Sequence, residues 1–128
     1  MMKVLPDDRR ILGEVMKRLA DSNIVDLIIT TGGTGFSESD VTPEATLDIV
    51  ERQVPGIPEA MRAYSTQFTK RAMLSRAAAG IRKQTLIVNF PGSPKSLKES
   101  LEYILPELIH GVEILQGIAK ECAAPKEA

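Results

Sequence analysis

The sequence predicts an α/β domain in which helices cover both faces of a mostly parallel sheet. Two short apolar segments, residues 24–30 and 85–90, are rich in β-branched residues and have the length of buried strands. Stretches with apolar residues at helical spacing lie before, between and after them. Buried strands that alternate with amphipathic helices are typical of a three-layer α/β/α fold.

The composition fits one globular domain, which we expect over residues 1–119, with a disordered tail at 120–128. Of the 128 residues, 43% are hydrophobic and 26% are charged, and the net charge is -1. Proteins that bind nucleic acids or membrane surfaces are usually strongly basic, and no apolar run reaches the roughly 18 residues of a membrane span. The single cysteine, Cys122, suits a reducing cytoplasm. We therefore expect a cytoplasmic protein that binds neither nucleic acid nor membrane.

The first helix and the first strand follow each other closely. Apolar residues between positions 11 and 19 recur at spacings of three and four and predict a helix. Asp7 or Asp8 can cap its N-terminus, and a polar stretch that begins at Asp21 ends it. The following residues 24–30 predict a fully buried strand.

Two further helices are predicted in the middle of the chain. Thr42 is a candidate N-cap and Pro43 suits the first helical position, so a helix should begin here and end near residue 53. Residues 54–58 contain two prolines and a glycine and predict a break. A second helix is expected over residues 59–68.

The last third of the chain predicts a helix, a strand and a long helix. Residues 71–79 are alanine-rich and should form a helix that ends at Gly80. The second strand, residues 85–90, precedes a long amphipathic helix over residues 96–116. Pro106 lies inside that helix and predicts a kink or a break.

A turn rich in glycine and threonine directly follows the first strand and is the most informative stretch for function. Its residues are Thr30, Thr31, Gly32, Gly33, Thr34 and Gly35. Glycines let a backbone approach a ligand closely, and exposed N–H and hydroxyl groups can hold phosphate oxygens. Asp40 adds a carboxylate, although an aspartate here could equally start the next helix. The pattern predicts a site for a nucleotide and a metal ion.

A second loop follows the second strand. Its residues are Pro91, Gly92, Ser93, Pro94 and Lys95. Because the carboxyl ends of parallel strands meet at one edge of a sheet, both loops should lie where open α/β sheets bind ligands. Lys95, Arg76 and Arg82 are candidate phosphate partners, although scattered cations are more often solvated.

Four stretches of sequence together carry a family resemblance. They are DLIITTGGTGFSESDVTPE at 26–44, GIPEAMR at 56–62, AMLSRAAAGIRKQTLIVNFPGSPK at 72–95 and YILPELIHGVEIL at 103–115. In this order they resemble molybdenum cofactor biosynthesis proteins of the MogA/MoaB type. The resemblance covers nearly the whole chain up to about residue 116.

The resemblance implies a molybdopterin-binding, MogA-like fold and the activity of a molybdopterin adenylyltransferase. Such enzymes transfer AMP from ATP to the terminal phosphate of molybdopterin and release pyrophosphate. The resemblance also implies a homotrimer and a site that holds Mg²⁺. It further suggests a partner protein that inserts molybdate.

The resemblance also implies roles for individual residues. Asp7 and Asp40 correspond to catalytic aspartates, and Asp40 is the expected Mg²⁺ ligand. Residues 30–35 would bind phosphate, while Ser75 and residues 91–95 would shape the pterin pocket. Judged on the residues alone, a helix cap is the default explanation for Asp7, and a packing residue in a helix of small residues is the favoured explanation for Ser75.

Two departures from the family's pattern leave other functions open. Family members usually carry a strand-helix unit before the Pro-Asp element, and we expect this unit to be absent here because Met1 almost adjoins Asp7. Residues 37–39 are Ser-Glu-Ser where relatives often place a basic residue. Both departures favour the alternative of a non-catalytic, MoaB-like molybdopterin-binding or scaffold protein. A CinA-type nucleotide-processing domain fits the LSRAAAG and ILPELIH stretches less well.

Overall fold

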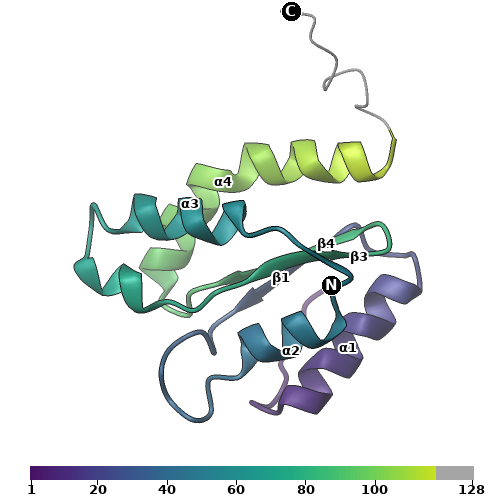
Figure 1. Cartoon of the computed structure of the whole chain (residues 1–128), viewed down its shortest axis with the longest axis horizontal. Helices are drawn as coiled ribbons and strands as arrows, with labels where there is room; N and C mark the ends of the chain where they lie inside the picture. Colours follow the sequence, from purple (N-terminus) through teal and green to yellow (C-terminus); the bar gives the residue numbers. More distant parts are fainter. Residues whose placement is uncertain (118–128) are drawn as a thin grey trace, which may run out of the picture.

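Helices lie on both faces of a central sheet, as Figure 1 shows for the computed structural model, which describes residues 1–117. The elements are α1 (Arg9–Asp21), β1 (Leu27–Thr31), α2 (Thr42–Ile49), β2 (Arg52–Gln53), α3 (Gly56–Ser65), the 3₁₀ helix η1 (Lys70–Leu74), β3 (Ala79–Arg82), β4 (Thr85–Phe90) and α4 (Pro94–Leu115). In Figure 1, α1 and α2 cover one face of the sheet, and α3 and α4 cover the other. The predicted three-layer α/β fold is confirmed.

The sheet has the strand order β1-β4-β3-β2. β4 pairs in parallel with β1, with Thr31 opposite Phe90, and pairs antiparallel with β3. β3 and β4 are joined by a tight turn in which Lys83 has a φ of 52°, and such a hairpin makes neighbouring strands antiparallel. The described sheet is therefore mixed rather than mostly parallel.

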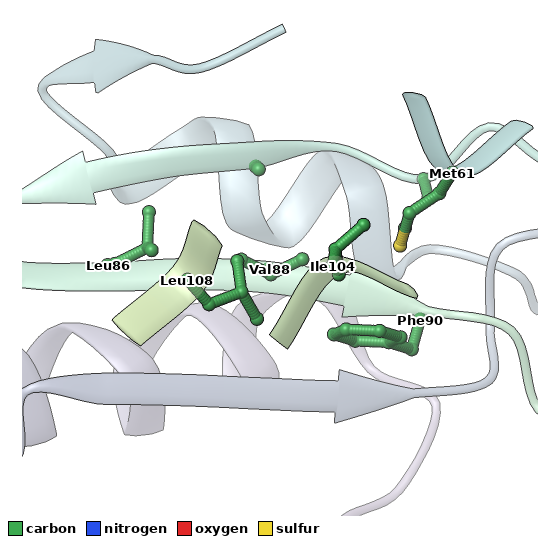
Figure 2. Packing of buried hydrophobic residues seen from close by; sticks show 8 residues of the cluster. Met61, Leu86, Val88, Phe90, Ile104 and Leu108 are labelled. Carbon is green, nitrogen blue, oxygen red and sulfur yellow. The ribbon is translucent and has the colours of Figure 1, made fainter. Parts of the chain in front are cut away.

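The hydrophobic core lies on both faces of β4, whose residues are all buried. On the side of α3 and α4, one cluster contains the six residues labelled in Figure 2: Met61, Leu86, Val88, Phe90, Ile104 and Leu108. On the other side, Ile87 packs with Met16, Ala45 and Ile49 from α1 and α2. Alternate residues of a strand face opposite sides, so a strand between two layers is buried along its whole length and its sequence is mostly apolar. This explains why residues 85–90 were predicted with the correct bounds.

The alanine-rich segment 71–79 is not the predicted helix. Only a short 3₁₀ helix forms there, and the chain then extends into β3. Ala77 and Ala79 are buried, and a Cβ added to Gly80 would lie 2.6 Å from Cγ1 of Val50. Small side chains are needed because β3 packs closely against its neighbours, and this packing outweighs the helix propensity of alanine.

The predicted cap of α1 is confirmed at Asp8, whereas both ends of α2 differ from the prediction. Asp8 caps α1, because its carboxylate accepts a hydrogen bond from the amide of Ile11 at 2.9 Å. The cap position of α2 is Val41 rather than Thr42, and no side chain caps this helix. α2 ends at Ile49 rather than near residue 53, because Arg52–Gln53 pairs with β3 as β2.

Other element bounds also shift. β1 begins at Leu27 and is only partly buried, since within the described sheet it has β4 on one side alone. α3 begins at Gly56 rather than residue 59, because Pro58 falls in the first turn, where a missing N–H is tolerated. α4 runs through Pro106 without a break.

Two further predictions concern the C-terminal tail and the presence of a membrane-spanning helix. The tail at residues 120–128, with Cys122, lies outside the described residues. Within residues 1–117, no helix has both the length and the apolar character that crossing a bilayer requires.

Candidate functional site

The loops that follow β1 and β4 lie against each other at one edge of the sheet. The amide of Gly32 donates a hydrogen bond to the carbonyl of Phe90 at 2.9 Å. A Cβ added to Gly92 would lie 3.1 Å from the Cα of Gly32, so the two backbones are in close contact. The predicted meeting of the two strand-end loops is confirmed.

Glycine at two positions of the first loop allows close contacts within the protein. Gly33 has a φ of 70°, and a Cβ there would collide with the Oγ1 of Thr42. A Cβ on Gly35 would lie 2.8 Å from the Oδ2 of Asp40. Gly33 therefore allows the turn to contact the start of α2, and Gly35 allows it to contact the carboxylate of Asp40.

The three threonines of this loop have different surroundings. The hydroxyl oxygen of Thr30 accepts a hydrogen bond at 3.0 Å from the side-chain amide of Asn89, which is completely buried. Thr34 is buried and Thr31 is exposed. The threonines therefore do not form one row of equally accessible phosphate donors.

Asp40 folds its carboxylate back onto its own loop. Its Oδ2 accepts a hydrogen bond from the amide of Ser37 at 2.9 Å, and its amide donates to the carbonyl of Ser37 at 2.9 Å. Asp40 precedes the cap position of α2 and makes no capping bond to that helix. The alternative in which Asp40 starts the helix is therefore wrong.

A cleft of about 260 Å³ lies beside the glycine loop. Its walls come from that loop, α3, the η1 segment and the beginning of α4. Four residues predicted for the site line it: Thr34, Gly35, Ser75 and Pro91. Ser75 follows η1 in an extended conformation, and its hydroxyl oxygen accepts a hydrogen bond from the amide of Ala77 at 3.2 Å.

Three other predicted site residues lie at helix starts or on the surface. Asp7 is exposed and does not cap α1. Ser93 is the N-cap of α4, and Lys95 in the first turn of that helix is exposed. None of the three lines the cleft.

The other two candidate phosphate partners are engaged by carboxylates. Arg76 forms an ion pair with Glu44 at 2.5 Å, and this contact lowers the pKa of the Glu44 carboxyl. Arg82 forms an ion pair with Asp21 at 2.8 Å, and the pKa of Asp21 is lowered for the same reason. In the described part of the chain, the Oε1 of Glu44 is buried and has no hydrogen-bond partner.

The donors available for Mg²⁺ near the glycine loop are oxygen atoms. Residues 1–117 contain no group of three or more acidic, histidine or cysteine side chains placed to hold a metal ion. Magnesium commonly takes one or two carboxylates and completes its shell with water and substrate phosphates. Asp40 fits this mode, since a carboxylate with one accepted N–H keeps further lone pairs for a cation.

A family model described as the "Probable molybdopterin binding domain" matches residues 1–110. The chain belongs to this molybdopterin-binding family. The matched region includes every residue that the sequence predicted for the site, from Asp7 to Lys95.

Individual relatives agree with this family assignment. The chain is 39% identical over 115 residues to a molybdopterin adenylyltransferase of Helicobacter pylori and 45% identical over 116 residues to one of Haemophilus influenzae. These matches cover 90% and 91% of this chain but 65% and 58% of the relatives. The chain thus spans less than two thirds of the length of these curated relatives.

A solved structure supports the fold. The molybdopterin biosynthesis enzyme MoaB from Thermus thermophilus superposes with a TM-score of 0.80 at 46% identity. The match covers 88% of this chain and 70% of that one.

The cleft of this molybdopterin-binding domain contains residues that the sequence analysis missed. Arg62 and Arg71 add positive charge, and the hydroxyls of Ser65 and Ser100 lie 3.4 Å apart within it. Arg62 also donates to the carbonyls of Ser75 and Ala77, at 3.2 and 3.1 Å. Its place in the GIPEAMR stretch was a usable signal, whereas Arg71 and the serines lie in segments that look like ordinary surface.

Proposed function

We propose that this molybdopterin-binding domain transfers AMP from ATP to the terminal phosphate of molybdopterin and releases pyrophosphate. The observation that carries the proposal is the contact between Gly32 and Phe90, which joins the two strand-end loops beside the cleft. The names of the bacterial relatives support the same chemistry.

The reaction joins two anions. A terminal phosphate oxygen of molybdopterin attacks the α-phosphorus of ATP, a new P–O bond forms, and the bond to pyrophosphate breaks. The site must hold both phosphates in line and neutralise their charge. We assign phosphate binding to residues 30–35 and the pterin side to Ser75 and residues 91–95. Arg71 in the cleft wall supplies positive charge.

We assign Mg²⁺ to Asp40 and an assisting catalytic role to Asp7. When bound, Mg²⁺ neutralises charge on the reacting phosphates. Asp40 suits this role because its Oδ2 is oriented by the amide of Ser37 at 2.9 Å. Asp7 is available because Asp8 takes the capping role of α1.

Pyrophosphate release in the presence of ATP, Mg²⁺ and molybdopterin tests the proposal. We expect release by the native chain, and a fall of roughly 100-fold in Asp40→Ala, because one group that orients or neutralises the reacting phosphates is lost. Asp26→Ala is the matched control, since this exposed aspartate precedes β1 at the opposite end of the sheet and should leave turnover unchanged.

Two results would revise the proposal. Unchanged turnover in Asp40→Ala would remove Asp40 from the mechanism. Tight binding of molybdopterin in isothermal titration, without pyrophosphate release by the native chain, would favour the binding or scaffold protein instead.

We also propose that the domain acts in the cytoplasm as a homotrimer and passes its product to a protein that inserts molybdate. The single cysteine suits a reducing compartment. Exposed apolar side chains along α4, such as Ile109 and Ile114, suit contacts between subunits.

A further inference from the structure

One arginine joins both ends of the loop that carries Asp40. The amide of Arg76 donates to the carbonyl of Thr34 at 2.8 Å, and its Nε donates to the carbonyl of Gly35 at 2.7 Å. Its Nη2 donates to the carbonyl of Asp40 at 2.6 Å. A single planar group thus fixes the distance between the start and the end of residues 35–40.

The guanidinium is itself held by the helix that follows the loop. Its Nη1 donates to the Oε2 of Glu44, in the first turn of α2, at 2.5 Å. The side chains of Arg76 and Glu44 are 34% and 36% exposed, so the pair is partly shielded from water. Because the fork geometry of arginine is rigid, the three side-chain contacts orient one another.

The loop has few other contacts that could hold its shape. The side chains of residues 36–39 are exposed, including that of Phe36 at 71%. The remaining hydrogen bonds of residues 36–40 are local ones that join Ser37 to Ser39 and Asp40. A loop without packed side chains depends on such polar bridges for its order.

We infer that Arg76 is the positioning residue for Asp40: its guanidinium fixes the backbone from which that carboxylate projects, and it is not a ligand of substrate phosphate. The inference rests on the proposed function only where it gives Asp40 a role in the reaction. The arrangement of the loop is independent of that role.

Kinetics of single and double variants test the functional half. We expect Arg76→Gln to lower kcat by on the order of 100-fold with little change in the KM for ATP. A displaced Asp40 carboxylate should slow the chemical step much more than it weakens the binding of ATP. If Arg76 acts through Asp40, the double variant Arg76→Gln/Asp40→Asn should be no slower than Asp40→Asn alone. Losses that multiply in the double variant would overturn the inference.

Arg76→Lys separates positioning from charge. Lysine keeps the positive charge but cannot bridge three acceptors at once. A positioning role predicts that the lysine and glutamine variants are equally slow, whereas a phosphate ligand would be partly replaced by lysine. Recovery of most activity in Arg76→Lys would therefore contradict the inference.

Amide hydrogen exchange tests the structural half without any turnover. The Ser37 and Asp40 amides should exchange at least about tenfold faster in Arg76→Gln, and faster than native in Glu44→Gln. Arg82→Gln is the matched control, because Arg82 likewise bridges a carboxylate and a carbonyl, those of Asp21 and Ile49, at the other end of the sheet. It should leave both amides unchanged.

The two measurements separate the two proposals. Unchanged exchange at Ser37 and Asp40 in Arg76→Gln would overturn the positioning role, whatever happens to activity. Faster exchange in Arg76→Gln, together with a native chain that releases no pyrophosphate, would leave the positioning of the loop standing and reject the proposed reaction.

Discussion

Gly33 is the residue of the site with the least room for change. An alanine there would keep a φ of 70° and drive its Cβ into the Oγ1 of Thr42. We expect Gly33→Ala to lower the free energy of unfolding by roughly 2–4 kcal/mol, from backbone strain and a steric clash. Urea denaturation followed by circular dichroism measures this change.

Gly56→Ala is the control for that experiment. Gly56 begins α3, and an added Cβ would have no heavy atom within 4 Å. The unfolding free energy of this variant should change by less than about 1 kcal/mol, because alanine is at least as favourable as glycine in a helix. Equal stability of the two variants would show that the turn relaxes around the new methyl group at position 33 without cost.

Single residues were predictable where the decisive partner is close in the sequence. Asp8 and Ile11 are three positions apart, so a cap at Asp7 or Asp8 followed from the pattern. The partners of the Arg76 side chain lie 32 to 41 positions away, and no local pattern distinguishes this arginine from a solvated one. The site predictions stay predictions for Asp7 and Asp40, whose chemistry the fold alone does not test.

A proline inside the helix α4 should lower the stability of the protein. Pro106 lies inside it, exposed, where a proline removes one backbone hydrogen bond and its ring crowds the preceding turn. We expect Pro106→Ala to raise the free energy of unfolding by about 1–3 kcal/mol in thermal or urea denaturation.

Pro94 gives the matched control at the start of the same helix. It occupies the first helical position, where the missing N–H has no intrahelical partner to lose. Pro94→Ala should therefore change stability by less than about 0.5 kcal/mol. A loss of stability in Pro106→Ala would mean that the packing of α4 requires the proline.

Elements were predictable where burial and propensity agree. In β4, β-branched residues occupy a strand that is buried on both faces, and its bounds were correct. In residues 71–79, the alanines favour a helix. In the structure, however, β3 begins at Ala79 and packs so closely at Ala79 and Gly80 that only small residues fit there. That packing depends on Val50, from another part of the chain, so the sequence pattern could not show it.

At the scale of the whole molecule, we expect three copies to associate. Sedimentation equilibrium should give a mass about three times the 14.0 kDa of one chain. The number three follows from the family resemblance. Association itself is favoured by apolar side chains on α4 such as Tyr103 and Ile109, which are each 49% exposed. The mass should not change across a tenfold dilution at micromolar concentration. A mass of one chain at all concentrations would contradict the expected trimer.

The layer arrangement was predictable, but the strand order was not. Alternating strands and helices predict an α/β/α fold from local patterns alone. The direction of β3 depends on the turn at Lys83. Because residues 71–79 were expected to form a helix, no strand was expected before that turn, and the hairpin was not predicted. An incorrect element thus led directly to an incorrect sheet topology.

Ser75 and Arg76 are adjacent in the sequence, but their side chains contact different parts of the site. Ser75 lines the cleft, while the side chain of Arg76 reaches the acidic loop. Successive residues of an extended chain point to opposite sides, so inserting or deleting one residue ahead of them would exchange their destinations. Pocket size therefore cannot be engineered by changing the length of this segment without also disturbing the loop. Variation in ligand preference has more freedom on the walls contributed by α3 and α4.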